Sequence, residues 1–217
     1  MIVAAGAERN APPIPGADLD HVWSGDELRR LMTDDRADEI AKRKLSFTQR
    51  ALMKAGSLVG VTDSADAIQN LSRVWMPLGK KVAIIGGGLV GIELAEFLVD
   101  RGREVVVLEE GPSLGRELSI VRRWRVLDTL REHGVALHTK VKIESIDKKA
   151  VRYADAEGVQ HTLAADSVVL AVGARPDDSL ARALEAAGVP VSSVGDGAQI
   201  GYIEGAVKSG MLAGLSA

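Results

Sequence analysis

The sequence contains no cysteine among its 217 residues. This absence excludes thiolate nucleophiles, redox-active disulfides, cysteine-ligated iron–sulfur clusters and cysteine zinc sites within the chain. Histidine is also scarce, and its spacing matches neither a metal site nor a catalytic triad: the four residues are His21, His133, His138 and His161. We therefore assign no catalytic residue and no metal ligand, and we expect structural or surface roles for the histidines.

Long apolar runs and excess charge are missing as well, and aromatic residues are few. No run approaches the ~20 apolar residues of a membrane helix, and residues 1–6 lack the basic start and apolar stretch of a signal peptide. Aromatic residues make up 3% and the net charge is −3, so neither base stacking nor global charge favours nucleic acid. We expect a folded cytoplasmic protein with no nucleic-acid or membrane partner.

Alternating elements in the middle of the chain are typical of a βαβ unit. Residues 82–85 form an apolar run, as expected for a strand buried on both faces. Residues 89–101 have apolar side chains at helical spacing and are followed by Gly102, a frequent helix-ending residue. Residues 105–108 form a second buried strand. Because parallel strands need such a crossover, this order predicts an α/β fold with a Rossmann-like parallel sheet.

Further elements precede and follow this unit. The pattern predicts helices over residues 26–56, 117–133, 180–187 and 202–212. It predicts a small antiparallel β-meander from three or four of the short strands over residues 135–139, 141–146, 150–153 and 159–163. Single strands are predicted over residues 2–5, 168–172 and 191–194.

The glycines between the first buried strand and its helix are spaced for a dinucleotide. Gly86, Gly88 and Gly91 form G-x-G-x-x-G in a strand–turn–helix context. The first glycine permits a tight turn, the second lets the backbone approach a pyrophosphate, and the third lets the helix pack against the strand. The N–H groups at the start of the helix would face the phosphates. The alternative is a glycine turn with a purely structural role.

An acidic residue ends the second strand, where it can select the dinucleotide. Glu109 lies 23 residues after Gly86 and can accept both ribose hydroxyls of NAD. A 2′-phosphate ~4 Å away would be repelled by about 4 kcal/mol at an effective dielectric of ~20. Glu110 adds to the repulsion if it points inward, although an exposed loop position is the alternative. The sequence therefore favours NAD, as NADH, over NADP.

Four short motifs in this order resemble a known family. Residues 86–95 (GGGLVGIELA) resemble the nicotinamide-binding motif of flavoproteins with two dinucleotide-binding domains, the FAD-dependent pyridine-nucleotide oxidoreductases. Residues 171–176 (AVGARP) resemble a later turn of the same domain, and residues 194–196 (VGD) resemble the motif that returns the chain to the FAD domain. Residues 4–7 (AAGA) resemble the A-T-G strand of the FAD domain, with Ala5 in place of threonine.

The resemblance implies roles for particular residues. It assigns NAD binding to Gly86, Gly87, Gly88, Leu89, Val90, Gly91, Glu109 and Gly173. Glu93 would lie near the nicotinamide, with a helix-surface acid as the alternative. Gly195 and Asp196 would contact FAD in the intact parent enzyme, with the N-terminus of helix 202–212 directed at the flavin.

The resemblance also implies a domain order. It divides the chain into a remnant of an FAD-binding domain (1–34), a helical basic connector (35–76), an NAD-binding domain (77–178) and a return to the FAD-binding domain (179–217). The long connector is similar to that of the 2,4-dienoyl-CoA reductase, enoate reductase and trimethylamine dehydrogenase group. We therefore expect a fragment of a multidomain enzyme whose partners are the missing flavin domains.

Two functions are consistent with these residues. The first is to position NADH for hydride transfer to FAD, where the flavin supplies the chemistry. The second is a non-catalytic module that binds an adenine nucleotide such as ADP. The net charge of +4 between Arg36 and Lys54 favours a contact surface or a solvated helix face. We expect either mobility across residues 35–60 or self-association to a homo-oligomer.

We expect the 217-residue chain, purified alone, to carry little or no FAD. Of the FAD site that the resemblance implies, only Gly6, Gly195 and Asp196 are present, and no second G-x-G-x-x-G precedes them. Absorbance of the purified protein in the flavin bands measures this. Stoichiometric flavin would contradict the expectation.

Overall fold

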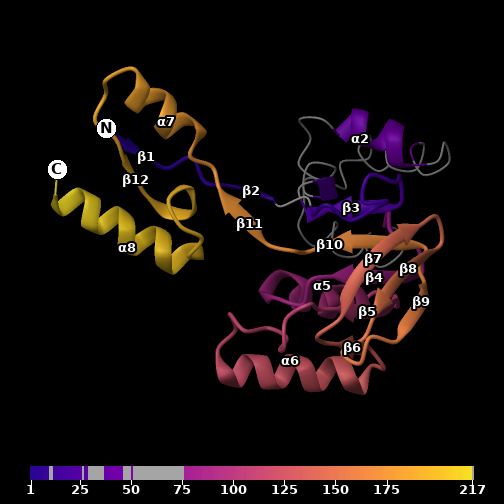
Figure 1. The fold of residues 1–217 in the computed structure, drawn as a ribbon. Coiled ribbons are helices and arrows are strands. Elements are labelled where there is room, and N and C mark those ends of the chain that lie inside the picture. The colour runs from indigo at the N-terminus through magenta and orange to yellow at the C-terminus, as the bar shows by residue number, and fades with distance from the viewer. Residues whose placement is uncertain (10–11, 26, 29–36, 46–49, 51–75, 217) are drawn as a thin grey trace, which may run out of the picture. The chain divides into compact units, whose positions relative to one another are not determined.

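The structure is a computed structural model and forms two compact units, which we describe separately. The smaller unit comprises Met1–Asn10 and Gly173–Ala217, and the larger comprises Ala11–Val172. The residues that the structure describes are 1–9, 12–25, 27–28, 37–45, 50 and 76–216 (Figure 1). Within them, no helix has both the length and the apolar character needed to cross a membrane.

A parallel sheet of five strands forms the centre of the larger unit (Figure 1). Its strands, in spatial order, are β3 (Val22–Ser24), β10 (Ser167–Leu170), β4 (Lys81–Ile85), β5 (Glu104–Leu108) and β6 (Ala136–His138). Every neighbouring pair is parallel. The α/β fold class and the predicted βαβ unit are therefore confirmed.

Side chains of the central strands alternate between two apolar clusters. On β4, Val82 and Ile84 pack with one cluster, and Ala83 and Ile85 pack with the other. Because successive side chains of a strand point to opposite faces, a continuous apolar run means that both faces are covered. This explains why the sequence here shows no alternation of apolar and polar residues.

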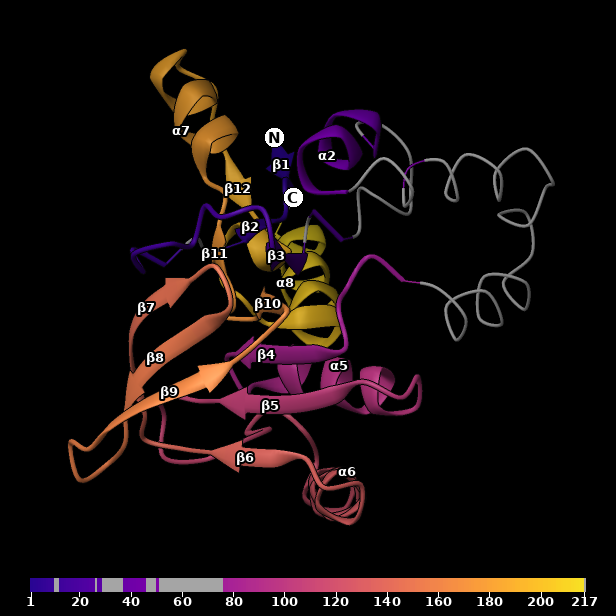
Figure 2. The same cartoon turned by 90° about the vertical axis from the view of Figure 1, so that its right-hand side faces the viewer.

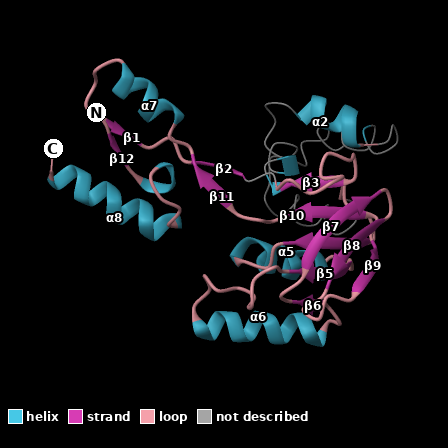
Figure 3. Ribbon diagram, in the orientation of Figure 1, coloured by secondary structure: helices cyan, strands magenta, loops and turns pink. Residues whose placement is uncertain are grey.

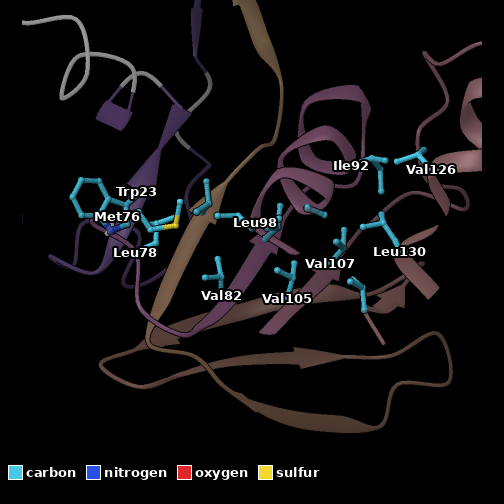
Figure 4. Close-up of a cluster of buried hydrophobic side chains, with 14 of the residues drawn as sticks. Trp23, Met76, Leu78, Val82, Ile92, Leu98, Val105, Val107, Val126 and Leu130 are labelled. Carbon is cyan, nitrogen blue, oxygen red and sulfur yellow. The ribbon is translucent and has the colours of Figure 1, made fainter. Parts of the chain in front are cut away.

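Helices cover one face of the sheet. They are α5 (Leu89–Val99), α6 (Ile120–Glu132) and the short α2 (Ala37–Lys44). Figure 4 shows Ile92 and Leu98 of α5 and Leu130 of α6 meeting Val105 and Val107 of β5. The helices thus share one core, which fixes the first turn of α5 against the sheet.

An antiparallel meander covers the opposite face (Figure 2). Its strands are β7 (Lys142–Asp147), β8 (Ala150–Ala154) and β9 (Gln160–Ala164). The meander has three strands, the smaller of the two predicted numbers, and the segment 135–139 contains β6, which pairs in parallel with β5 instead. The thirteen residues of α6 provide the crossover that this parallel pairing requires.

The sequence did not predict strand β3. Lys44, the last residue of α2, links this helix to β3 and to Glu27, which follows β3. The Lys44 ammonium donates to the Val22 carbonyl and, at 2.8 Å, to the Glu27 carboxylate. Burial lowers the pKa of Lys44, with Glu27 opposing this effect. Burial also opposes ionisation of Glu27, but hydrogen bonds from Lys44 and the Ser24 N–H outweigh it and lower the pKa of that carboxyl.

Little of the connector belongs to the described residues. Helix α2 lies inside the predicted helix 26–56, and the charged stretch contributes its Lys42, Arg43 and Lys44 to the last turn of α2. The expectation of mobility across residues 35–60 falls largely outside the described residues.

The smaller unit is built from short strands and two helices (Figure 3). Strand β1 (Ile2–Val3) pairs in parallel with β12 (Ser192–Ser193), and β2 (Ala7–Arg9) pairs antiparallel with β11 (Ala174–Pro176), a pair that the sequence did not predict. Helix α7 (Ser179–Ala186), the 3₁₀ turn η2 (Gly195–Gly197) and helix α8 (Tyr202–Leu215) complete it. Helix α8 exposes apolar side chains four residues apart: Ile203, Val207, Met211 and Leu215.

Two valines of α6 test the placement of this helix. Val126 is fully buried, whereas Val121 is 67% exposed. We expect Val126→Ala to lower the free energy of unfolding by about 2 kcal/mol, from lost burial and the cavity left behind. Val121→Ala should change it by less than about 0.5 kcal/mol. Urea unfolding followed by circular dichroism measures both, and equal effects would contradict the packing.

Candidate dinucleotide-binding site

The turn after β4 requires glycine at its first position. Gly86 has a φ of +105°, which residues with a Cβ rarely adopt. A Cβ there would lie 2.3 Å from the carbonyl oxygen of Ala171, at the end of β10. The Gly86 N–H donates to the Leu108 carbonyl over 2.8 Å. The turn is thereby held between the carboxyl ends of the two strands that flank β4.

Helix α5 begins directly on this turn. A Cβ on Gly91 would lie 1.9 Å from the carbonyl oxygen of Gly86, so only glycine permits the observed approach. Gly88 is the N-terminal cap residue, and Leu89, Val90 and Gly91 form the first helical turn. This geometry agrees with the packing role expected for Gly91. It also directs the N–H groups at the start of α5 toward the carboxyl edge of the sheet.

Gly88 differs from the other two glycines of the motif. Its φ of −70° and ψ of −168° are open to any residue. The atoms nearest to a Cβ there would be those of the Glu117 carboxyl group, with the nearest oxygen at 3.2 Å. Because that group ends a flexible side chain, the nearest neighbour of Gly88 can move aside. A pyrophosphate needs such an approach to the backbone.

Glu109 follows β5 and is hydrogen-bonded to the glycine turn. Its Oε2 accepts the Gly87 N–H at 2.5 Å, and its Oε1 accepts the Gly111 N–H at 2.6 Å. Two backbone donors thus fix the orientation of the carboxylate beside the turn. Glu110, the next residue, is exposed, which agrees with the alternative of a loop position.

The segment after Glu109 folds over the glycine turn, a contact that the sequence did not predict. The Gly115 N–H donates to the Gly87 carbonyl at 2.7 Å. The buried Leu114 side chain packs so closely on Gly87 that a Cβ there would lie 2.2 Å from Leu114 Cδ2. The Arg123 Nε donates to the Leu114 carbonyl at 2.7 Å. Residues 110–118 are therefore held by hydrogen bonds both to the glycine turn and to Arg123 of α6.

Glu117 is the second carboxylate at the turn. Its Oε2 accepts the N–H of Leu89, the first residue of α5, at 3.0 Å. The prediction placed Glu117 in helix 117–133, which was wrong, since α6 begins at Ile120 with Ser119 as its cap residue. The loop composition of residues 111–115 (GPSLG) was the available signal, because glycine and proline end regular elements.

Glu93 lies one turn further along α5. It is exposed, and it contributes to the raised pKa of Arg122 on α6, after the larger effect of the hydrogen bond from Arg122 to Glu96. The remaining expected contact, Gly173, belongs to the smaller unit and has a φ of +86°.

The residues expected at FAD lie together in the smaller unit. Asp196 Oδ1 accepts the N–H groups of Gly201 and Tyr202 at 2.9 and 3.0 Å, so it caps the N-terminus of α8. Gly195 has a φ of +65° and donates its N–H to Ser209 Oγ of the same helix at 2.8 Å. Across the described residues of both units, no three acidic or histidine side chains form a group that could hold a metal ion.

Comparison with known proteins decides the family. Residues 1–199 match the family model described as pyridine nucleotide-disulphide oxidoreductase. The chain belongs to this family. Members of the pyridine nucleotide-disulphide oxidoreductase family use NAD(H) and FAD, which confirms the two cofactors expected from the resemblance.

Individual relatives are oxidoreductases much longer than this chain. It is 34% identical over 214 residues to the bilirubin reductase of Mediterraneibacter gnavus, covering 98% of the chain and 26% of the relative. It is 32% identical over 132 residues to the NADH oxidase of Thermoanaerobacter brockii, covering 60% and 20%. A structure of 2-naphthoyl-CoA reductase is 25% identical with a TM-score of 0.66, covering 96% of the chain and 25% of that protein. The chain thus spans about a quarter of these proteins.

Gly91 provides a test of the turn. We expect Gly91→Ala to weaken NADH binding at least tenfold, because a Cβ 1.9 Å from the Gly86 oxygen must displace the turn or the helix. Gly102→Ala, at the other end of α5, is the control: its φ of +69° costs about 1 kcal/mol of stability, but the Cβ meets nothing within 4 Å. Calorimetric titration measures both affinities. Binding by the Gly91 variant as tight as by the wild type would contradict the geometry.

Proposed function

We propose that this chain is the NAD(H)-binding part of a flavin-dependent oxidoreductase and positions NADH for hydride transfer to FAD. The observation that carries the proposal is the glycine turn at the carboxyl end of β4, followed directly by the N-terminus of α5. The nicotinamide dinucleotide supplies the hydride when bound, and the chain supplies its binding and orientation.

The place of the turn in the sheet supports this function. From β4 the chain passes to β5 and β6 on one side, whereas β10 and β3 lie on the other side. In open parallel sheets, ligands bind outside the carboxyl ends of the strands at the point where the strand order reverses. Gly86 lies at this point, beside the end of β10.

Each group of residues then serves one part of the dinucleotide. The N–H groups around Gly88 and Leu89, together with the positive end of the α5 dipole, would hold the pyrophosphate. Glu109 would accept the ribose hydroxyls, and its bonds to Gly87 and Gly111 already orient it. Glu93 is proposed near the nicotinamide end, Gly173 against the dinucleotide, and Gly195 and Asp196 at the flavin.

The parent enzyme is proposed to be similar to the 2,4-dienoyl-CoA reductase group. The lengths of the bilirubin reductase and of the 2-naphthoyl-CoA reductase, each about four times the chain, support a multidomain parent. In that enzyme residues 77–178 would form the NAD-binding domain, and residues 1–34 and 179–217 would belong to the FAD-binding domain. The remaining flavin domains would be the partners of the chain, and we propose a cytoplasmic location.

The choice of dinucleotide tests this proposal. We expect the chain to bind NADH at least about tenfold more tightly than NADPH, because Glu109 would repel a 2′-phosphate. Glu109→Arg should narrow or reverse this preference, since a guanidinium pairs with a phosphate. Calorimetric titration with NADH, NADPH and ADP measures the affinities.

A neighbouring residue provides the control for this experiment. Glu110→Arg makes the same change of charge at an exposed position and should alter the preference far less. Equal or tighter binding of NADPH by the wild type would contradict the proposal. Binding of ADP with no gain from the nicotinamide half would favour the non-catalytic alternative.

A further inference from the structure

The start of helix α5 is hydrogen-bonded to a carboxylate of the chain itself. Glu117 accepts the Leu89 N–H at 3.0 Å, and its second oxygen lies 3.2 Å from the position of a Cβ on Gly88. A carboxylate at a helix N-terminus satisfies a backbone donor and is favoured by the helix dipole. The same donor and the same dipole would bind a pyrophosphate.

We propose that Glu117 competes with the pyrophosphate of the dinucleotide, so that each binding event must displace its carboxylate from Leu89. This inference rests on the proposed function, because it assigns regulation to the same site. Two anions do not share one N–H group, and the dinucleotide carries two phosphate charges. Glu117 therefore lowers the affinity of the site and favours release of the nucleotide.

The contacts around Glu117 allow its carboxylate to leave Leu89 without a movement of the backbone. Gly115 and Arg123 anchor the backbone of the segment independently, through the Gly87 and Leu114 carbonyls. Glu117 itself is an exposed residue, so its carboxylate regains water when it leaves the helix. Only the side chain has to move, while the loop keeps its contact with the glycine turn. Glu109, in contrast, holds Gly87 and Gly111 and stays in place to meet the ribose.

The test compares Glu117→Gln and Glu117→Ala with the wild type in two measurements. Calorimetric titration should give NADH and ADP affinities about twofold to fivefold higher for both variants, the range expected for one charge at a helix N-terminus. Adenosine, which has no phosphate, should show no change. Thermal unfolding without nucleotide should show lower stability for both variants, because Gln loses the charge that the helix dipole favours and Ala loses the hydrogen bond as well.

The combination of higher nucleotide affinity and lower thermal stability distinguishes competition from a purely structural role of Glu117. If Glu117 only supported the loop, its variants would lose both stability and affinity, and this result would overturn the inference. Glu132→Gln removes the same charge at the exposed end of α6 and is the matched control, with unchanged affinity expected. Unchanged NADH binding by the Glu117 variants, with normal binding by the wild type, would overturn only this inference. No binding of NADH or ADP by any variant would overturn the proposed function as well.

Discussion

The site depends on one close approach, that of helix α5 to the turn which precedes it. The carbonyl oxygen of Gly86 occupies the space that a Cβ on residue 91 would need. This contact brings the first N–H groups of α5 to the carboxyl edge of the sheet, next to the end of β10. The cores on the two faces of β4 hold the strand in place, so that the turn and the helix meet with little freedom.

Carboxylates accept hydrogen bonds from backbone N–H groups at the starts of α5 and α8, the two helices with a glycine cap among the described residues. Glu117 and Glu109 bind the N–H groups of Leu89 and Gly87 at the start of α5. Asp196 binds those of Gly201 and Tyr202 at the start of α8. Because the first N–H groups of a helix have no partner within it, an anion is the favoured acceptor. A helix start that binds phosphate is thus equally attractive to the acids of its own chain.

Local patterns predicted most of the larger unit, and long-range pairing explains what they missed. Strands β4 and β5 with α5 could be predicted because apolar runs, glycines and a helical period are adjacent in sequence. Strand β3 is only three residues long, and its partner β10 lies more than 140 residues away. The sequence left the partner of residues 135–139 open for a similar reason, since a short apolar strand does not encode its neighbour. In the site, Gly86, Gly91 and Glu109 lie at the turn, in the first turn of α5 and after β5, as their spacing in the sequence indicates. The hydrogen bond from Leu89 to Glu117 joins residues 28 positions apart, and no local pattern predicts it.

Two residues that lie far apart in the sequence, Leu45 and Met76, belong to the same hydrophobic core of the larger unit. Leu45, just after α2, and Met76, shortly before β4, are both buried in the cluster that contains Val82 and Leu98. Figure 4 shows the last three of these side chains. Packing at these two residues thus joins helix α2 and the start of β4 in one core, although more than 30 residues separate the two elements in the sequence. A substitution near either residue can therefore reach the strand that carries the glycine turn, because both share its core.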